Sequence, residues 1–152
     1  MNSLFRMPSV GEVLIGQPSK PDRALARSLA GLLAAFPEVL EAHLPQCYAP
    51  EKMTNPAQVL MVVFSGPQGA QEVMPRVREG IARLLPRGAF LDVWPVTAPG
   101  AFLESVRGAR CKILGRVYSG KAVTEDPWSP WGRLRSFFRR GGLIWIRSSE
   151  ER

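Results

Sequence analysis

The sequence predicts an α+β domain over residues 1–120, followed by a basic and aromatic extension over residues 121–152. Short apolar runs have the length of buried strands, two longer stretches carry apolar residues at helical spacing, and arginine and tryptophan concentrate near the C-terminus. The chain of 152 residues is long enough for one hydrophobic core, and its 45% hydrophobic and 22% charged content is ordinary for a globular protein. We therefore expect one body with an appendage.

The first strand and helix organise the chain. Val13–Ile15 is an apolar run that ends at Gly16, as expected of a strand covered on both faces. Ser19 is the expected N-cap, with Pro21 in the first helical turn, and Pro37 ends the helix. Apolar residues at spacings of three and four predict its inner face, formed by Leu25, Leu29, Leu32 and Phe36.

A second strand is predicted over Leu40–Tyr48. Pro45 lies inside it, and because proline cannot donate to a sheet ladder, we expect this strand at an edge. Residues 49–57 are rich in proline and polar residues and predict a loop. The run Gln58–Phe64 is almost wholly apolar and has no proline, so it is predicted to be a central strand.

A second helix and a fourth strand follow. Ser65–Gly69 is typical of a turn, and the helix is predicted over Gln71–Leu85, because Pro75 is best tolerated in a first turn. Ala89–Val96 is the next strand, where Pro95 again indicates an edge. The inner face of the helix is predicted to hold Met74, Val77, Ile81 and Leu84.

The order of strand, helix, strand, strand, helix, strand predicts a ferredoxin-like βαββαβ core. In that arrangement the first and third strands are central, and the second and fourth, which contain the prolines, lie at the edges. A third helix is expected over Gly100–Gly108 and a fifth strand over Cys111–Tyr118, extending or capping an edge.

Three phrases of the body carry a resemblance to a known family. They are VLIGQP at residues 13–18, FPEVLEAHL at 36–44 and ILGRVYSG at 113–120. With the order of elements, they resemble the C-terminal domain of the enhanced serine sensitivity (SseB-type) protein family of bacteria, over about Val10 to Gly120. The resemblance implies a similar fold and a bacterial protein. It implies no catalytic residues, because the family has no agreed ones.

The two cysteines are candidate nucleophiles. Cys111 and Arg116 are spaced like the ends of a rhodanese sulfurtransferase loop, but the residues between them alternate as in a strand. His43 and Cys47 would lie about 13 Å apart along an extended strand, too far for a catalytic pair. We expect both cysteines to be reduced and structural, and no metal or other cofactor is predicted.

The charge of the chain is concentrated near its C-terminus. The net charge is +7; residues 1–120 carry 13 basic against 9 acidic side chains, whereas residues 127–149 carry five arginines and no acid. Residues 1–12 do not resemble a signal peptide, and nothing approaches the roughly 18 consecutive apolar residues of a membrane span. We therefore expect a cytoplasmic protein.

The extension is the predicted binding segment. Trp128, Trp131, Leu134 and Phe138 follow helical spacing, Gly141 and Gly142 would break the helix, and residues 143–146 predict a short strand. These aromatics either cover the body or form an exposed patch. The candidate partner-binding residues are Trp128, Trp131, Arg133, Leu134, Arg135, Phe137, Phe138, Arg139, Arg140 and Trp145.

Together these patterns favour a non-enzymatic interaction module. A protein partner is the first expectation for the extension, since the segment is short for membrane anchoring and the body offers no wide basic surface for nucleic acid. A homo-oligomer is compatible with the same patch, and no small-molecule substrate is indicated. The alternatives are a thiol-dependent enzyme and binding of a membrane surface or nucleic acid through the extension.

Overall fold

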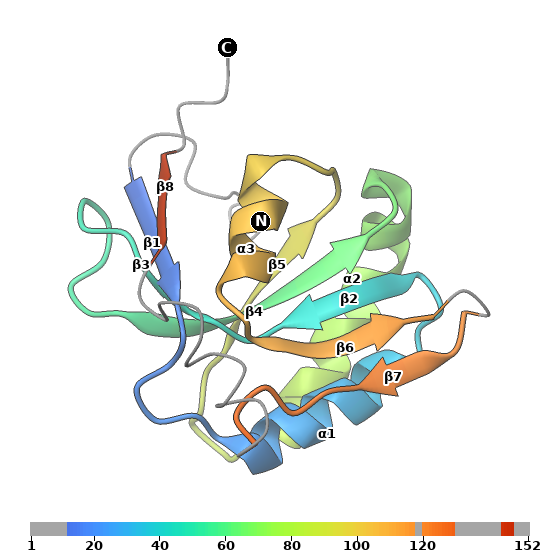
Figure 1. Cartoon of the computed structure of the whole chain (residues 1–152). Coiled ribbons are helices and arrows are strands. Elements are labelled where there is room, and N and C mark those ends of the chain that lie inside the picture. Colours follow the sequence, from blue (N-terminus) through green and yellow to red (C-terminus); the bar gives the residue numbers. More distant parts are fainter. Residues whose placement is uncertain (1–11, 118–119, 130–143, 148–152) are drawn as a thin grey trace.

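The computed structural model describes residues 12–117, 120–129 and 144–147 (Figure 1). Its helices are α1 (Arg23–Ala34), α2 (Pro67–Leu84) and α3 (Ala101–Gly108). Its strands are β1 (Glu12–Gly16), β2 (Val39–His43), β3 (Gln46–Tyr48), β4 (Ala57–Phe64), β5 (Asp92–Val96), β6 (Lys112–Arg116), β7 (Ala122–Thr124) and β8 (Ile144–Arg147). The α+β class predicted from the sequence is confirmed. No helix among the described residues is long and apolar enough to cross a membrane.

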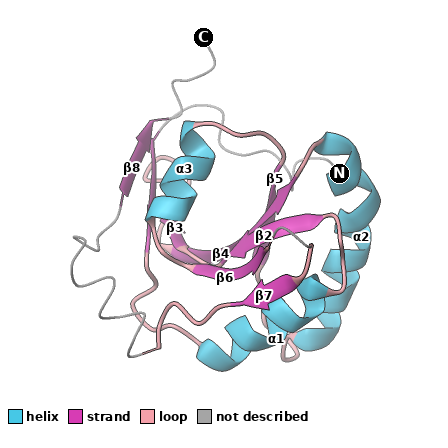
Figure 2. Cartoon of the chain, turned by 45° about the vertical axis from the view of Figure 1, so that its right-hand side comes forward, coloured by secondary structure: helices cyan, strands magenta, loops and turns pink. Residues whose placement is uncertain are grey.

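The strands pair in the order β7-β6-β2-β4-β3-β1-β8, with β5 added beside β4. β4 and β5 run parallel, and every other described pair is antiparallel. Helices α1 and α2 cover one face of the sheet, whereas α3 lies on the opposite face, against β1 and β8 (Figure 2). The layers bury one continuous core, in which β4 contributes six consecutive buried residues.

The ferredoxin-like strand order is not confirmed. That order would place β1 beside the third predicted strand, which is β4. β1 instead pairs with β3 and β8. The neighbours of β4 are β2, β3 and β5, so its predicted central position is confirmed. β4 and β5, which α2 connects, are instead direct parallel neighbours. The sequence pattern could not distinguish this from the split arrangement, in which the first strand would lie between them.

The strand expected over Leu40–Tyr48 is two strands separated at Leu44 and Pro45. β2 pairs with β4 and β6, and β3 pairs with β4 and β1, so the edge position expected from Pro45 is wrong. Proline is tolerated here because it lies between two ladders, and its carbonyl oxygen accepts a hydrogen bond from Val59 N at 3.0 Å. The edge position expected from Pro95 is confirmed among the described strands, since β5 pairs only with β4.

Helix α1 differs from its prediction at the cap and in its buried face. The N-cap is Asp22, whose side chain accepts a hydrogen bond from Leu25 N at 3.0 Å, and not Ser19. Ser19 N instead donates to Gln46 Oε1 at 3.2 Å. The fully buried face is rotated towards small residues that allow a close approach to the sheet, and it consists of Ala26, Leu29, Ala30 and Leu33.

Helix α2 begins earlier than predicted. It starts at Pro67, so the turn expected over Ser65–Gly69 is partly helical and Pro75 lies inside the helix, not in its first turn. Pro75 is exposed, which lets its ring project away from the core, although the residue has no N–H to donate to the carbonyl of Gln71. The inner face is close to the prediction and consists of Ala70, Val73, Met74, Val77 and Ile81.

The expected third helix and fifth strand are present as α3 and β6. β6 is not an edge strand, because it pairs with β2 on one side and with β7 on the other. The residues after Gly120 also contribute to the fold: β7 extends the sheet, Trp128 is only 3% exposed, and the short strand expected near residue 145 is present as β8, paired with β1. Parts of the predicted extension are therefore built into the body.

Candidate functional site

The two thiols are buried and do not form a nucleophilic site. Cys47, in β3, and Cys111, next to β6, are both free and 0% exposed. Burial raises the pKa of each thiol to about 12. Because the thiolate is the reactive form, neither sulfur is prepared for nucleophilic attack near neutral pH.

The segment from Cys111 to Arg116 is not a sulfurtransferase loop. Most of it is strand β6, and the Arg116 guanidinium donates to carbonyl oxygens. Nε donates to Val39 O at 2.6 Å, Nη2 to Phe36 O at 2.6 Å and to Ala34 O at 3.3 Å, and Nη1 to Gly120 O at 3.0 Å. Arg116 therefore ties the C-terminal end of α1 to the start of β2, where helix carbonyls lack partners of their own.

His43 pairs with Glu41 and not with Cys47. Its Nε2 lies 3.1 Å from Glu41 Oε1, and the ring is 1% exposed. Arg107, from α3, also donates to both carboxylate oxygens of Glu41. The hydrogen bond from His43 and then the contacts of Arg107 lower the pKa of Glu41 to about 2, against the opposing effect of burial. The signal in the sequence for this contact was the spacing of two between Glu41 and His43, which places both side chains on the same face of a strand.

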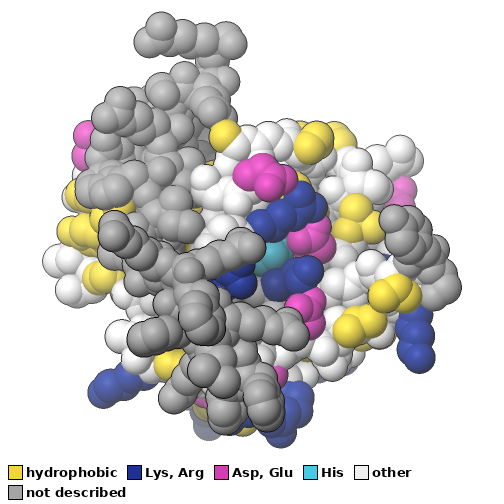
Figure 3. Space-filling view, viewed as in Figure 1, with side chains coloured by type: hydrophobic (Ala, Val, Ile, Leu, Met, Phe, Trp, Pro, Cys, Tyr) yellow, Lys and Arg dark blue, Asp and Glu magenta, His cyan; other side chains and the backbone are white. Residues whose placement is uncertain are grey.

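The charged cluster of Glu41, His43 and Arg107 joins α3 to the sheet. Figure 3 shows the imidazole among acidic and basic side chains near the middle of the face opposite α1 and α2. Lys112, the register partner of His43 on β6, adds an ion pair with Glu125 at 3.3 Å. The described carboxylates in and beside the cluster are each paired with a cation. The ion pair between Glu41 and Arg107 therefore serves to hold α3 against the sheet.

One side of α2 faces two hollows along β5, which together we name the α2–β5 groove. The first hollow has a volume of about 430 Å³. Pro95 of β5 and Thr97, which follows that strand, form its other wall. The α2 residues that line it are Pro67, Ala70, Gln71, Met74 and Pro75, so the surface is largely apolar.

The second hollow continues along the same helix face. It has a volume of about 230 Å³ and is closed by residues 89–93, at the start of β5. Phe90, at its rim, is 80% exposed, the highest value among the large hydrophobic side chains of the described residues. Its other lining residues are Arg78, Ile81 and Ala82 of α2 and Leu85, the C-cap of that helix. They continue the spacing of three and four seen in the first hollow, so the two form one stripe.

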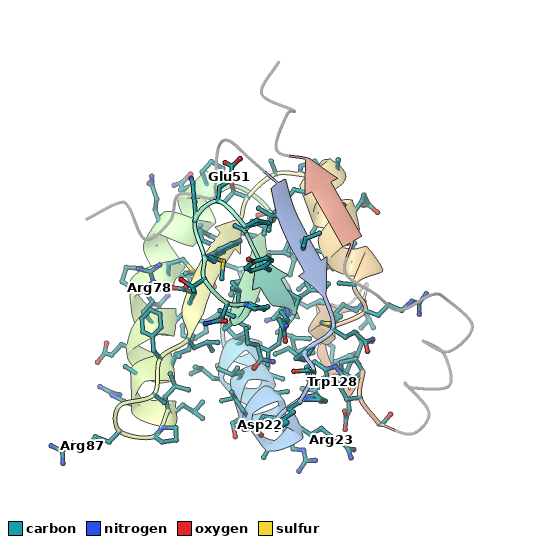
Figure 4. The ribbon with its side chains drawn as sticks, turned by 90° about the vertical axis from the view of Figure 1, so that its left-hand side faces the viewer. Asp22, Arg23, Glu51, Arg78, Arg87 and Trp128 are labelled. Atoms are coloured by element: carbon teal, nitrogen blue, oxygen red, sulfur yellow. The ribbon has the colours of Figure 1, made fainter. Side chains whose placement is uncertain are left out.

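The polar groups of the groove lie near its middle and at the Phe90 end. Arg78 Nη2 donates to Val93 O at 3.4 Å, and burial lowers the pKa of Arg78 from its ordinary value, against the favourable effect of Asp92. Arg87 lies on the turn after α2 and points away from the body, on the same side as Arg78 (Figure 4). The sequence showed no motif here, although the apolar Phe90 beside the Pro86–Gly88 turn was a usable signal.

The residues predicted to bind a partner fall into three groups. Trp128 belongs to the buried core, so it is not part of an exposed patch. Trp145 lies on β8, opposite Leu14 of β1. The remaining predicted residues lie outside the described residues, namely Trp131, Arg133, Leu134, Arg135, Phe137, Phe138, Arg139 and Arg140.

Within the described ranges, no group of three or more His, Cys, Asp or Glu side chains could hold a metal ion. No family model, no curated protein and no solved structure matches this chain.

Proposed function

We propose that this protein is a non-enzymatic interaction module that binds a protein partner in the α2–β5 groove. The observation that carries the proposal is Phe90, a large aromatic side chain that is 80% exposed at the rim of an apolar hollow. Aromatic anchors beside apolar pockets are typical of the residues that dominate protein interfaces. Covering a phenylalanine of this kind is worth about 1.5–3 kcal/mol.

The resemblance to the SseB-type family is compatible with this proposal, since it implied a similar fold without catalytic residues. The Arg-rich aromatic segment at residues 131–140 is proposed as a second contact, with a protein partner preferred to a membrane surface or nucleic acid. Its support is the run of arginines and aromatics with no acidic residue.

Removal of residues 121–152 would not test the proposal cleanly. The deletion also removes β7, β8 and the buried Trp128, so lost binding would follow from a damaged fold. A single exposed substitution avoids this difficulty. Phe90→Asp places a charge at the groove, and Val123→Asp is the matched control, because Val123 is an exposed apolar residue (40%) on β7, outside the groove.

The test compares cross-linked complexes recovered with the two variants and the parent protein from extract of the source cells. We expect Phe90→Asp to lose a specific set of cross-linked proteins that Val123→Asp retains. Cross-linked peptides should map to α2 and to residues 86–93. An identical set of proteins with all three chains would contradict the assignment of the groove.

A further inference from the structure

We propose that the segment bound in the α2–β5 groove is an amphipathic α-helix that places a carboxylate side chain beside Arg87. This inference rests on the proposed function and adds the secondary structure and charge of the partner. It follows from three properties of the groove, which are the state of the β5 main chain, the shape of the α2 stripe and the charges around Phe90.

The main chain of β5 is poorly prepared to accept another strand. A strand that adds to a sheet edge needs a row of free N–H and C=O groups. The Val93 carbonyl already accepts a hydrogen bond from Arg78, and Pro95 has no N–H. An extended partner would therefore lose hydrogen bonds to water without regaining them in a ladder.

A helix suits the groove because it satisfies its own main-chain hydrogen bonds. The apolar stripe runs from Pro67 to Leu85, which corresponds to about 27 Å at 1.5 Å per residue. A partner helix of about 15–18 residues is about 22–27 Å long, which is close to this length, and its apolar side chains at spacings of three and four would fill the two hollows. Pro67, Pro75 and Pro95 line the first hollow. They offer apolar contact area, and they have no main-chain N–H groups that would need a hydrogen-bond partner when the helix binds.

The charges near Phe90 favour an acidic helix. Arg83 pairs with Glu79 on the outer side of α2, and Arg78 lies close enough to Asp92 for their charges to interact. Arg87 is exposed and forms no ion pair with the described residues. It is thus a cation available to a partner at the end of the groove that Phe90 marks. The net charge of +7 favours approach of the same acidic partner.

The contributions of Phe90 and Arg87 to binding of the helix differ in size. Loss of the Phe90 ring should weaken binding about 10-fold or more, because covering such a ring is worth about 1.5–3 kcal/mol. An exposed ion pair is worth about 0.2–1 kcal/mol, which is about 1.4-fold to 5-fold in affinity. Apolar contact therefore determines whether the helix binds, and Arg87 determines which helix is preferred.

The test uses the full chain and three labelled synthetic peptides, with fluorescence anisotropy as the readout. Two are stapled 15-residue helices with the same leucine stripe, one with glutamate and one with lysine on the flanking positions. The third is an extended peptide with alternating isoleucine and threonine. The protein variants are Phe90→Ala and Arg87→Glu, with Lys121→Glu as a charge control on an exposed residue outside both hollows.

We expect the glutamate helix to bind best and Phe90→Ala to weaken it about 10-fold or more. Arg87→Glu should shift the preference towards the lysine helix by about 2-fold to 10-fold, whereas Lys121→Glu should change it less than about 2-fold. The inference is overturned if no helix binds, if the extended peptide binds best, or if both charge reversals act equally. The proposed function fails separately, if Phe90→Asp retains every partner that the parent protein captures from extract.

Discussion

Replacement of Arg116 by alanine should destabilise the fold by about 3 kcal/mol. The guanidinium holds four carbonyl oxygens, and the contacts with Phe36, Val39 and Gly120 are each 3.0 Å or shorter. A hydrogen bond from a charged donor is worth about 1.5–3 kcal/mol. The expected loss in unfolding free energy is smaller than the sum of these values. Arg116 is half-buried, so in the alanine variant water can reach some of the carbonyl oxygens that the guanidinium contacted.

Urea unfolding followed by circular dichroism at pH 7 measures this effect. The expected loss corresponds to a decrease in Tm of about 6–12 °C for a chain of this size. Arg116→Lys should recover only part of the loss, since one ammonium group cannot replace a planar fork that contacts four oxygens. The control is Arg83→Ala, which breaks an exposed ion pair with Glu79 and should cost less than about 0.5 kcal/mol. A loss for Arg116→Ala no larger than that of the control would refute the reasoning.

Three further predictions concern the acid stability, the thiols and the core. The lowered pKa of Glu41 contributes stability that is present above about pH 4.5 and is lost as the pH falls towards 2; the difference in unfolding free energy between the parent protein and Glu41→Gln should therefore narrow across that window, and a constant difference would contradict it. Cys47 and Cys111 should both resist Ellman's reagent at pH 8 in the native protein and both react after denaturation, so rapid native labelling of either would disprove the buried assignment. Trp128→Ala should cost about 3–5 kcal/mol, as large aromatic truncations in cores do. Trp128→Phe should cost less, because the indole N–H has no hydrogen-bond partner among the described residues, and equal losses in urea unfolding would argue against this.

Local patterns predicted most of the elements, because helix and strand periodicity depends on nearby residues. The central strand β4, the helices α1 and α2 and the C-terminal strand β8 were all expected at about the positions where they occur. The predictions failed where proline was interpreted without its surroundings. Pro45 lies between two strands in the interior of the sheet, and Pro75 is accommodated on the exposed side of a long helix.

The candidate site could be predicted only in part. The expectation that both cysteines are structural agrees with their burial. Strand-like alternation indicated this for Cys111, and the usual burial of free cysteine indicated it for Cys47. The groove was not predicted, because its residues come from α2 and β5, and neither segment alone indicates that the two leave hollows between them. Phe90 was assigned to a strand, whereas it precedes β5 and is exposed.

The sequence by itself determined the α+β class, the positions of most helices and strands and the concentration of arginine near the C-terminus. These properties follow from composition and from periodicity along the chain. Only the tertiary structure decided which strands are neighbours, that Arg116 holds the end of α1, that Glu41 pairs with His43 and Arg107, and that α2 and β5 leave an apolar groove. Those outcomes depend on contacts between residues far apart in the chain, which local periodicity does not specify.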